Sequence, residues 1–158
     1  MEQTVKKELN EFIETFVNAG DNVSKVLRLH ALTENYLERM IILRLKYGEK
    51  ITNDSRFSYH HKLQIANAFG IDGNLVGALR KLSSLRNECA HSRKPEITTE
   101  AILEISAPLQ SKFKKALLEI EGDFPELTAL AWLIFTELSI IVAPIETVFP
   151  ELKVGLSK

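Results

Sequence analysis

The sequence predicts an all-α protein, a single helical bundle of about six helices formed by residues 1–158. Apolar residues recur three or four positions apart along most of the chain, which is the spacing of one helix face. No segment shows the apolar–polar alternation of a half-buried strand. Only 7 glycines and 5 prolines occur in 158 residues, too few for a loop-rich β-sandwich.

The first two helices are expected on either side of Gly20. The first carries apolar residues at helical spacing from Leu9 to Val17, and glycine then stops it. Asp21 or Asn22 can cap the second, longer helix, which we expect to end near Gly48. The polar stretch 49–56 contains Asn-Asp-Ser and is predicted to be a loop.

Turn residues and capping residues separate the next helices. Ser58 is the predicted N-cap of a helix that runs through Phe69 and ends at Gly70. After a turn at Asp72-Gly73, a helix is predicted over residues 74–91. Residues 92–97 form a short connection that contains a proline, so the chain is expected to change direction there.

Two prolines organise the last part of the chain. Thr98 or Thr99 caps the next predicted helix, and Pro108 should break it near Ser106, because proline lacks an N–H and clashes with the preceding turn. A new helix is expected from Pro108 to residue 121. A turn then leads into the last helix, predicted over residues 125–142 and closed by Pro144.

The last predicted helix is almost wholly apolar from residue 127 to residue 142. This run is shorter than the roughly 20 residues that cross a bilayer, and it contains Glu137. It is therefore interpreted as a helix buried in the core or at a subunit interface, with no membrane span. An apolar helix in so small a chain also favours a homodimer.

Composition limits the function classes. The chain is 45% hydrophobic and 26% charged, with a net charge of −1, so a broad basic surface for long nucleic acid is not expected. Cys89 is the single cysteine, which excludes an internal disulfide and a cysteine metal cluster and fits a reducing compartment. The charged start lacks the apolar core of a secretory signal. We expect a cytoplasmic protein that needs no metal or other cofactor.

The helix over residues 74–91 combines a core stripe with a polar flank. At about 100° per residue, five residues form the core stripe. They are Leu75, Leu79, Leu82, Leu85 and Cys89. Arg86, Ala90, Asn87 and His91 follow beside it, within an arc of about 140°. Small residues lie between the large polar ones and leave room for a ligand or another helix.

The side chains of this flank suit a phosphodiester. Arg86 carries a permanent charge and two donors for phosphate oxygens, His91 titrates near neutral pH, and Asn87 can orient either. Four further cations, Arg80, Lys81, Arg93 and Lys94, make the segment locally basic and are candidate RNA contacts. The structural alternative is that Arg86 and His91 pair with carboxylates of a neighbouring helix.

Residues Leu85 to His91 resemble the Arg-Asn-x-x-x-His motif of the HEPN superfamily. The resemblance extends to the mannitol operon repressor (MtlR) branch through four other segments. These are Leu32–Glu38, Phe57–Leu63, Phe69–Ile71 and Thr136–Leu138. Members of the superfamily are small helical bundles, often dimeric, and many are metal-independent ribonucleases. By this resemblance the catalytic residues are Arg86 and His91, with Asn87 as a polar helper.

Two functional hypotheses follow from the resemblance. The first is a HEPN RNA-binding domain or endoribonuclease, a toxin or defence effector whose site is shared across a dimer and whose partner is RNA or an antitoxin. The second is a non-catalytic MtlR-like transcriptional regulator that acts through protein contacts. The chain departs from one toxin branch, which has tyrosine where Arg93 stands here. It also lacks a helix-turn-helix or zinc pattern.

Overall fold

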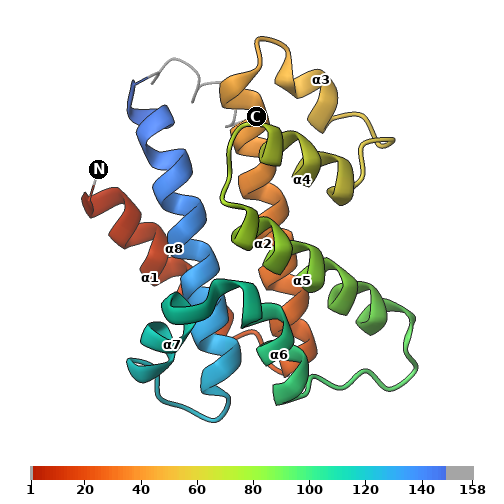
Figure 1. The fold of residues 1–158 in the computed structure, drawn as a ribbon, viewed down its shortest axis with the longest axis vertical. Helices are drawn as coiled ribbons and strands as arrows, with labels where there is room; N and C mark the ends of the chain where they lie inside the picture. Colours follow the sequence, from red (N-terminus) through yellow and green to blue (C-terminus); the bar gives the residue numbers. More distant parts are fainter. Residues whose placement is uncertain (1, 149–158) are drawn as a thin grey trace.

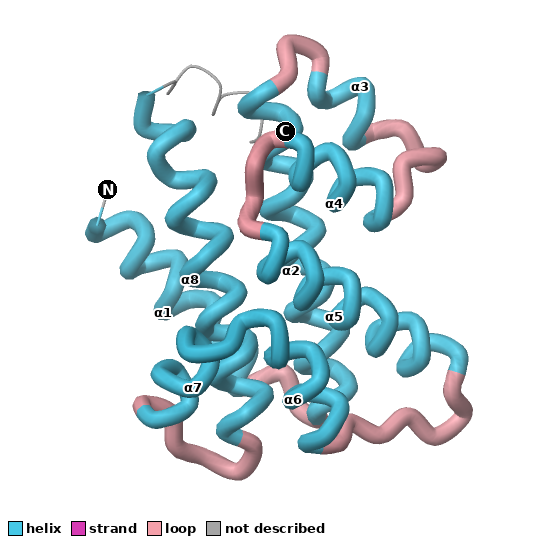
Figure 2. The backbone as a smooth tube through the Cα atoms, viewed as in Figure 1, coloured by secondary structure: helices cyan, strands magenta, loops and turns pink. Residues whose placement is uncertain are grey.

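The computed structural model describes residues 2–148 and confirms the all-α class. Over this range the chain forms eight α-helices and one 3-10 helix, without a strand (Figures 1 and 2). In chain order they are α1 (Glu2–Val17), α2 (Asn22–Arg44), α3 (Gly48–Thr52), α4 (Tyr59–Ala68), α5 (Gly73–His91), α6 (Thr99–Ser106), η1 (Ala107–Leu109), α7 (Gln110–Leu118) and α8 (Pro125–Val148).

The predicted boundary between α1 and α2 is confirmed. Gly20 has φ +90°, a left-handed conformation that strains other residues, and it lets the chain turn after α1. Asp21 then caps α2, because its carboxylate accepts a 2.7 Å hydrogen bond from the Ser24 amide. Helix α2 crosses the middle of the molecule and packs against α3, α4, α5 and α8 (Figure 1).

The prediction of a loop over residues 49–56 is wrong in its first part, because α3 forms there. The helix is only one turn long and carries no apolar periodicity that a sequence pattern could reveal. The chain instead turns tightly against α2 at Gly48, where an added Cβ would lie 2.5 Å from the Ile41 carbonyl oxygen. A close backbone approach, not local periodicity, therefore places α3.

The caps predicted for α4 and α6 are confirmed, and α5 begins with a cap at the predicted turn. Ser58 precedes α4, and its amide donates to the His61 Nδ1 at 3.2 Å. Asp72 accepts from the Asn74 amide at the start of α5, and Thr98 accepts from the Ala101 amide at the start of α6. These contacts satisfy amides that have no partner inside the helix, so α4, α5 and α6 begin close to the predicted positions.

The break at Pro108 is confirmed, but the following α-helix starts later than predicted. Residues Ala107–Leu109 form a 3-10 turn, and α7 begins only at Gln110. Gln110 has φ +47° and ψ −119°, a strained conformation for a residue with a Cβ. The chain therefore changes direction between η1 and α7, while Pro108 packs beside Gly77 of α5.

The prediction that Pro144 closes the last helix is wrong, since α8 continues to Val148. Proline removes the N–H that would bond the Ile140 carbonyl, and Ile140 is 63% exposed, so water can replace that partner. By length and composition alone Pro125–Ile145 could cross a membrane, but half of these residues are buried inside the fold. That degree of burial is typical of a core helix.

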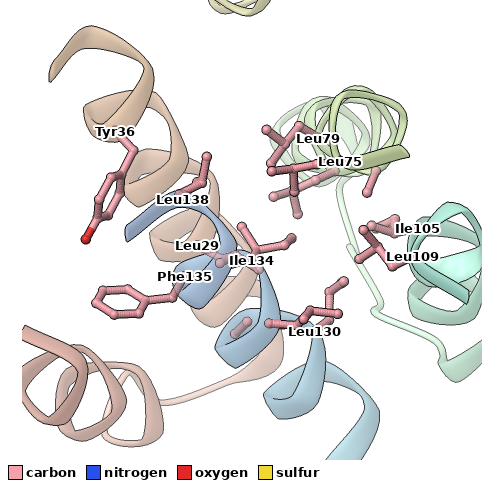
Figure 3. Close-up of a cluster of buried hydrophobic side chains, with 14 of the residues drawn as sticks. Leu29, Tyr36, Leu75, Leu79, Ile105, Leu109, Leu130, Ile134, Phe135 and Leu138 are labelled. Carbon is pink, nitrogen blue, oxygen red and sulfur yellow. The ribbon is translucent and has the colours of Figure 1, made fainter. Parts of the chain in front are cut away.

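One hydrophobic cluster joins the helices. Figure 3 shows side chains of α8, among them Ile134, Phe135 and Leu138, between Tyr36 of α2 on one side and Leu79 of α5 on the other. Phe135 also stacks on Phe12 of α1, with ring centroids 5.0 Å apart. Helix α8 thus holds α1, α2, α6 and α7 together, and α2 in turn positions α5.

Candidate functional site at the end of α5

The core face predicted for α5 is confirmed and fixes which way its polar flank points. All five residues of the predicted stripe, from Leu75 to Cys89, are buried, with Leu79 and Leu82 fully inaccessible. Because the stripe faces α2, α4 and α6, the residues about a quarter turn away lie at the surface.

The three predicted catalytic residues are all exposed on the last turns of α5. Arg86 donates from Nη1 to the Asn87 Oδ1 at 3.2 Å, so the amide orients the guanidinium. His91 occupies the last turn of α5. In Figure 1 this end of α5 lies at the edge of the molecule opposite α1 and α8.

Neither Arg86 nor His91 forms an ion pair with a carboxylate in the part of the chain that the structure describes. The structural alternative, in which both pair with a neighbouring helix, is not observed there. Arg86 has further N–H donors besides the one that Asn87 accepts. The end of α5 therefore carries donors and charge that a ligand can use.

The four predicted RNA contacts are placed differently from one another. Arg93 and Lys94 are exposed in the loop that follows α5, and Arg80 is exposed further back, near the middle of the helix. Lys81 instead reaches α6, where its Nζ donates to the Glu104 carbonyl at 3.1 Å and lies 3.9 Å from the Glu104 carboxylate. Lys81 thus contributes to helix packing, and the other three extend the basic surface.

A buried polar cluster lies beside the site and was not predicted from the sequence. His30 of α2 is 7% exposed and lies against Tyr59 of α4, with ring centroids 4.2 Å apart. The Thr33 hydroxyl donates its one hydrogen to the His30 carbonyl at 2.7 Å, so the Tyr59 hydroxyl must donate to Thr33, at 2.9 Å. Burial raises the pKa of Tyr59 and keeps it a donor.

His30 links this cluster electrostatically to Arg86. Burial lowers the pKa of His30; the charge of Glu34 opposes this shift and that of Arg86 adds to it. The buried His30 Nε2 has no hydrogen-bond partner among the described residues. Burial therefore favours the neutral form of His30, and the charge of Arg86 favours it further.

Lys62 completes the cluster. Its ammonium is buried and lies 2.7 Å from a Glu34 oxygen, and it also bonds Glu38 one turn further along α2. Burial opposes the charge of Lys62, but hydrogen bonds to the two carboxylates raise its pKa overall. Helix α4 thus supplies a partner for this pair of glutamates on α2.

The arrangement suits anion binding and proton transfer more than metal chemistry. Among the side chains that the structure describes, no three His, Cys, Asp or Glu residues are grouped closely enough to hold a metal ion. Cys89 faces the core beside the site, and burial raises the pKa of its thiol, so it is a poor nucleophile. The side chains available for chemistry are those of Arg86, Asn87 and His91.

No family model, curated protein or solved structure matches the chain. Its function has to be inferred from the side chains of the site.

Proposed function

We propose that this chain binds RNA at the C-terminal end of α5 and cleaves it as a metal-independent endoribonuclease, the activity that the HEPN resemblance implies. One observation carries the proposal: Arg86, Asn87 and His91 are exposed together on one helix end, without a carboxylate partner among the described residues. A permanent cation and an imidazole on the same helix end, neither with a carboxylate partner there, suit a phosphodiester.

Arg86 supplies charge in this proposal. Its guanidinium stays protonated at every accessible pH, so it can neither remove nor donate a proton. Held by Asn87, it binds the non-bridging oxygens of the scissile phosphate and stabilises the charge that develops on them during attack.

His91 supplies the proton transfer. Its neutral imidazole accepts the proton of a ribose 2′-hydroxyl, the 2′-oxygen forms a bond to phosphorus, and the bond from phosphorus to the 5′-oxygen breaks. The leaving 5′-oxygen takes a proton from a second imidazole. The products are a 2′,3′-cyclic phosphate and a 5′-hydroxyl, so every proton and electron pair is accounted for without a metal ion.

A second copy of the chain is the proposed source of the second imidazole. The exposed flank of α5 carries the small residues Ser84 and Ala90 between its larger side chains, which lets another helix approach closely. A two-fold axis near this flank brings two copies of His91 and two of Arg86 to one RNA cleft.

The test compares Arg86→Ala and His91→Ala with Lys114→Ala, an exposed cation on α7 away from the site. In EDTA, each site variant should lose at least about 100-fold in the rate of RNA cleavage. The control should cleave like the wild type. All three should unfold within about 0.5 kcal/mol of the wild type, because each side chain is exposed. A wild type that leaves RNA intact in EDTA, or site variants that cleave normally, would refute the proposal.

A second candidate, the non-catalytic regulator, is favoured by apolar side chains at the surface. Leu118 of α7 is 88% exposed and Ile140 of α8 is 63% exposed, and a protein partner would remove these apolar side chains from water. This candidate predicts a wild type without cleavage whose binding to a protein partner depends on Leu118 or Ile140.

A further inference from the structure

A basic and aromatic surface patch lies where α2 gives way to α3, and the proposed cleavage site does not use it. Tyr47 is 61% exposed, although most tyrosines bury their rings. Two ammonium groups lie over its ring, with Lys46 Nζ 5.3 Å and Lys50 Nζ 5.0 Å from the ring centroid. Both lysines are exposed.

Positive charge exceeds negative charge in this patch. Arg44 is exposed beside the two lysines, with its guanidinium 5.6 Å from the centre of the Phe69 ring. Glu49 is the one carboxylate close by in sequence that is not already paired, since Asp54 is bound by Arg56 at 2.6 Å. None of the three cations forms an ion pair with a described carboxylate.

The Tyr47 side chain neither caps a helix nor packs in the hydrophobic core. The residue is the N-cap of α3, but its side chain makes no capping hydrogen bond, and its ring is outside the hydrophobic core. The contacts with Lys46 and Lys50 are exposed cation–π contacts, which are weaker than the stacking of a nucleobase on an aromatic ring. A base can therefore displace the ammonium groups, which then remain close enough to bind the adjacent phosphates.

We propose that Tyr47, with Lys46 and Lys50, is a stacking platform for an unpaired base of single-stranded RNA. This inference rests on the proposed function for its ligand, but it concerns binding and not cleavage. Helix α4 lies between α3 and α5 in Figures 1 and 2, so the platform and the end of α5 are separate surfaces. RNA that stacks on Tyr47 is held at a distance from the reacting phosphate. The platform prefers single-stranded RNA over duplex RNA but does not distinguish between bases, because every base has a face that can stack.

The experiment measures the affinity of a fluorescein-labelled oligouridylate, by anisotropy, with His91→Ala present in every protein so that the probe stays intact. Tyr47→Ala should weaken binding about tenfold or more, and Tyr47→Phe, which keeps the ring, by less than about twofold. An RNA duplex of equal length should bind both variants alike, because its bases are already stacked. Replacing Lys46 and Lys50 by glutamine should lower the salt dependence of single-strand binding by about one unit in log–log slope.

The possible results separate this inference from the proposed function. Tyr47-dependent binding of the single strand by a protein whose wild type never cleaves RNA would support the platform and refute the nuclease. Equal affinity of Tyr47→Ala and its parent for the oligouridylate would overturn the platform whatever the cleavage result. An equal loss for duplex and single strand, or binding to anionic vesicles in place of RNA, would overturn it as well.

Discussion

Charged and titratable side chains are concentrated in two regions of the molecule. One is the contact between α2 and α4, where they are buried and paired, and the other is the C-terminal end of α5, where they are exposed and unpaired with any carboxylate that the structure describes. Between α2 and α4, the ammonium of Lys62 is buried and bonded to Glu34 and Glu38. At the end of α5, Arg86 and His91 are exposed and have no carboxylate partner among the described residues. The two regions lie close enough for Arg86 to influence the pKa of His30.

The difference separates charges that stabilise the fold from charges available to a ligand. A buried charge without a partner is costly, so Lys62 must be bonded for α4 to pack on α2. An exposed charge gains little from a partner and loses little without one. We therefore expect substitutions in the first region to change stability and substitutions in the second to change binding or activity.

The largest effect on stability is expected from Lys62→Met. The change removes one buried partner and leaves two half-buried carboxylates facing apolar atoms, which should cost about 2 kcal/mol of unfolding free energy. In a domain of this size the melting temperature should fall by about 4–8 °C. Thermal and urea unfolding measure both quantities. Arg86→Met is the matched comparison and should stay within about 0.5 kcal/mol of the wild type; equal losses would remove the distinction between the regions.

A smaller effect is expected from His30, and it depends on pH. Burial lowers the pKa of His30; the charge of Glu34 raises it and the charge of Arg86 lowers it further. His30 therefore takes up its proton at lower pH in the folded protein than in the unfolded chain. The unfolded chain protonates near its ordinary value of about 6.5, so stability falls as pH drops from there towards the folded pKa. His30→Leu should therefore lose less stability than the wild type between about pH 7.5 and pH 5. Parallel stability curves for the two proteins would show that His30 is not held neutral.

The smallest effect is expected from Lys112→Met, which breaks an ion pair between α7 and α8 at the surface. The Lys112 ammonium lies 2.9 Å from a Glu137 oxygen, only slightly further than the 2.7 Å between Lys62 and Glu34, but the Lys112 side chain is 55% exposed. Burial and not distance should decide the outcome, so we expect a loss of at most about 0.5 kcal/mol in urea unfolding. A loss as large as that of Lys62→Met would mean that ion-pair geometry matters more than burial.

Most of the fold could be predicted because most helix boundaries depend on residues close together in the sequence. Asp21, Ser58, Asp72 and Thr98 cap helices through contacts within three residues, which a sequence pattern reveals. The failures involve contacts that are distant in sequence. Helix α3 depends on the close approach of Gly48 to α2, and α8 continues past Pro144 because the lost hydrogen bond falls on an exposed side.

In the candidate site too, local features could be predicted and contacts between distant segments could not. The positions of Arg86 and His91 follow from the periodicity of one helix, so their exposure beside the core stripe could be foreseen. The partners of Glu34 and the surroundings of His30 could not, because Lys62 and Tyr59 come from α4, more than two dozen residues later in the chain. Periodicity locates a residue on its own helix, whereas the partner depends on how helices pack.

The exposure of Arg86, Asn87 and His91 has an evolutionary consequence. Since none of the three fills the core or satisfies a buried charge, substitutions at these positions carry little stability cost, and selection on folding does not retain them. A lineage that keeps the bundle can lose these side chains by drift once cleavage is no longer useful, or regain them by a few substitutions. Among descendants of such a fold, substitutions at the end of α5 would accompany changes of function. Substitutions in the α2–α4 cluster would be limited by the need to keep the fold stable.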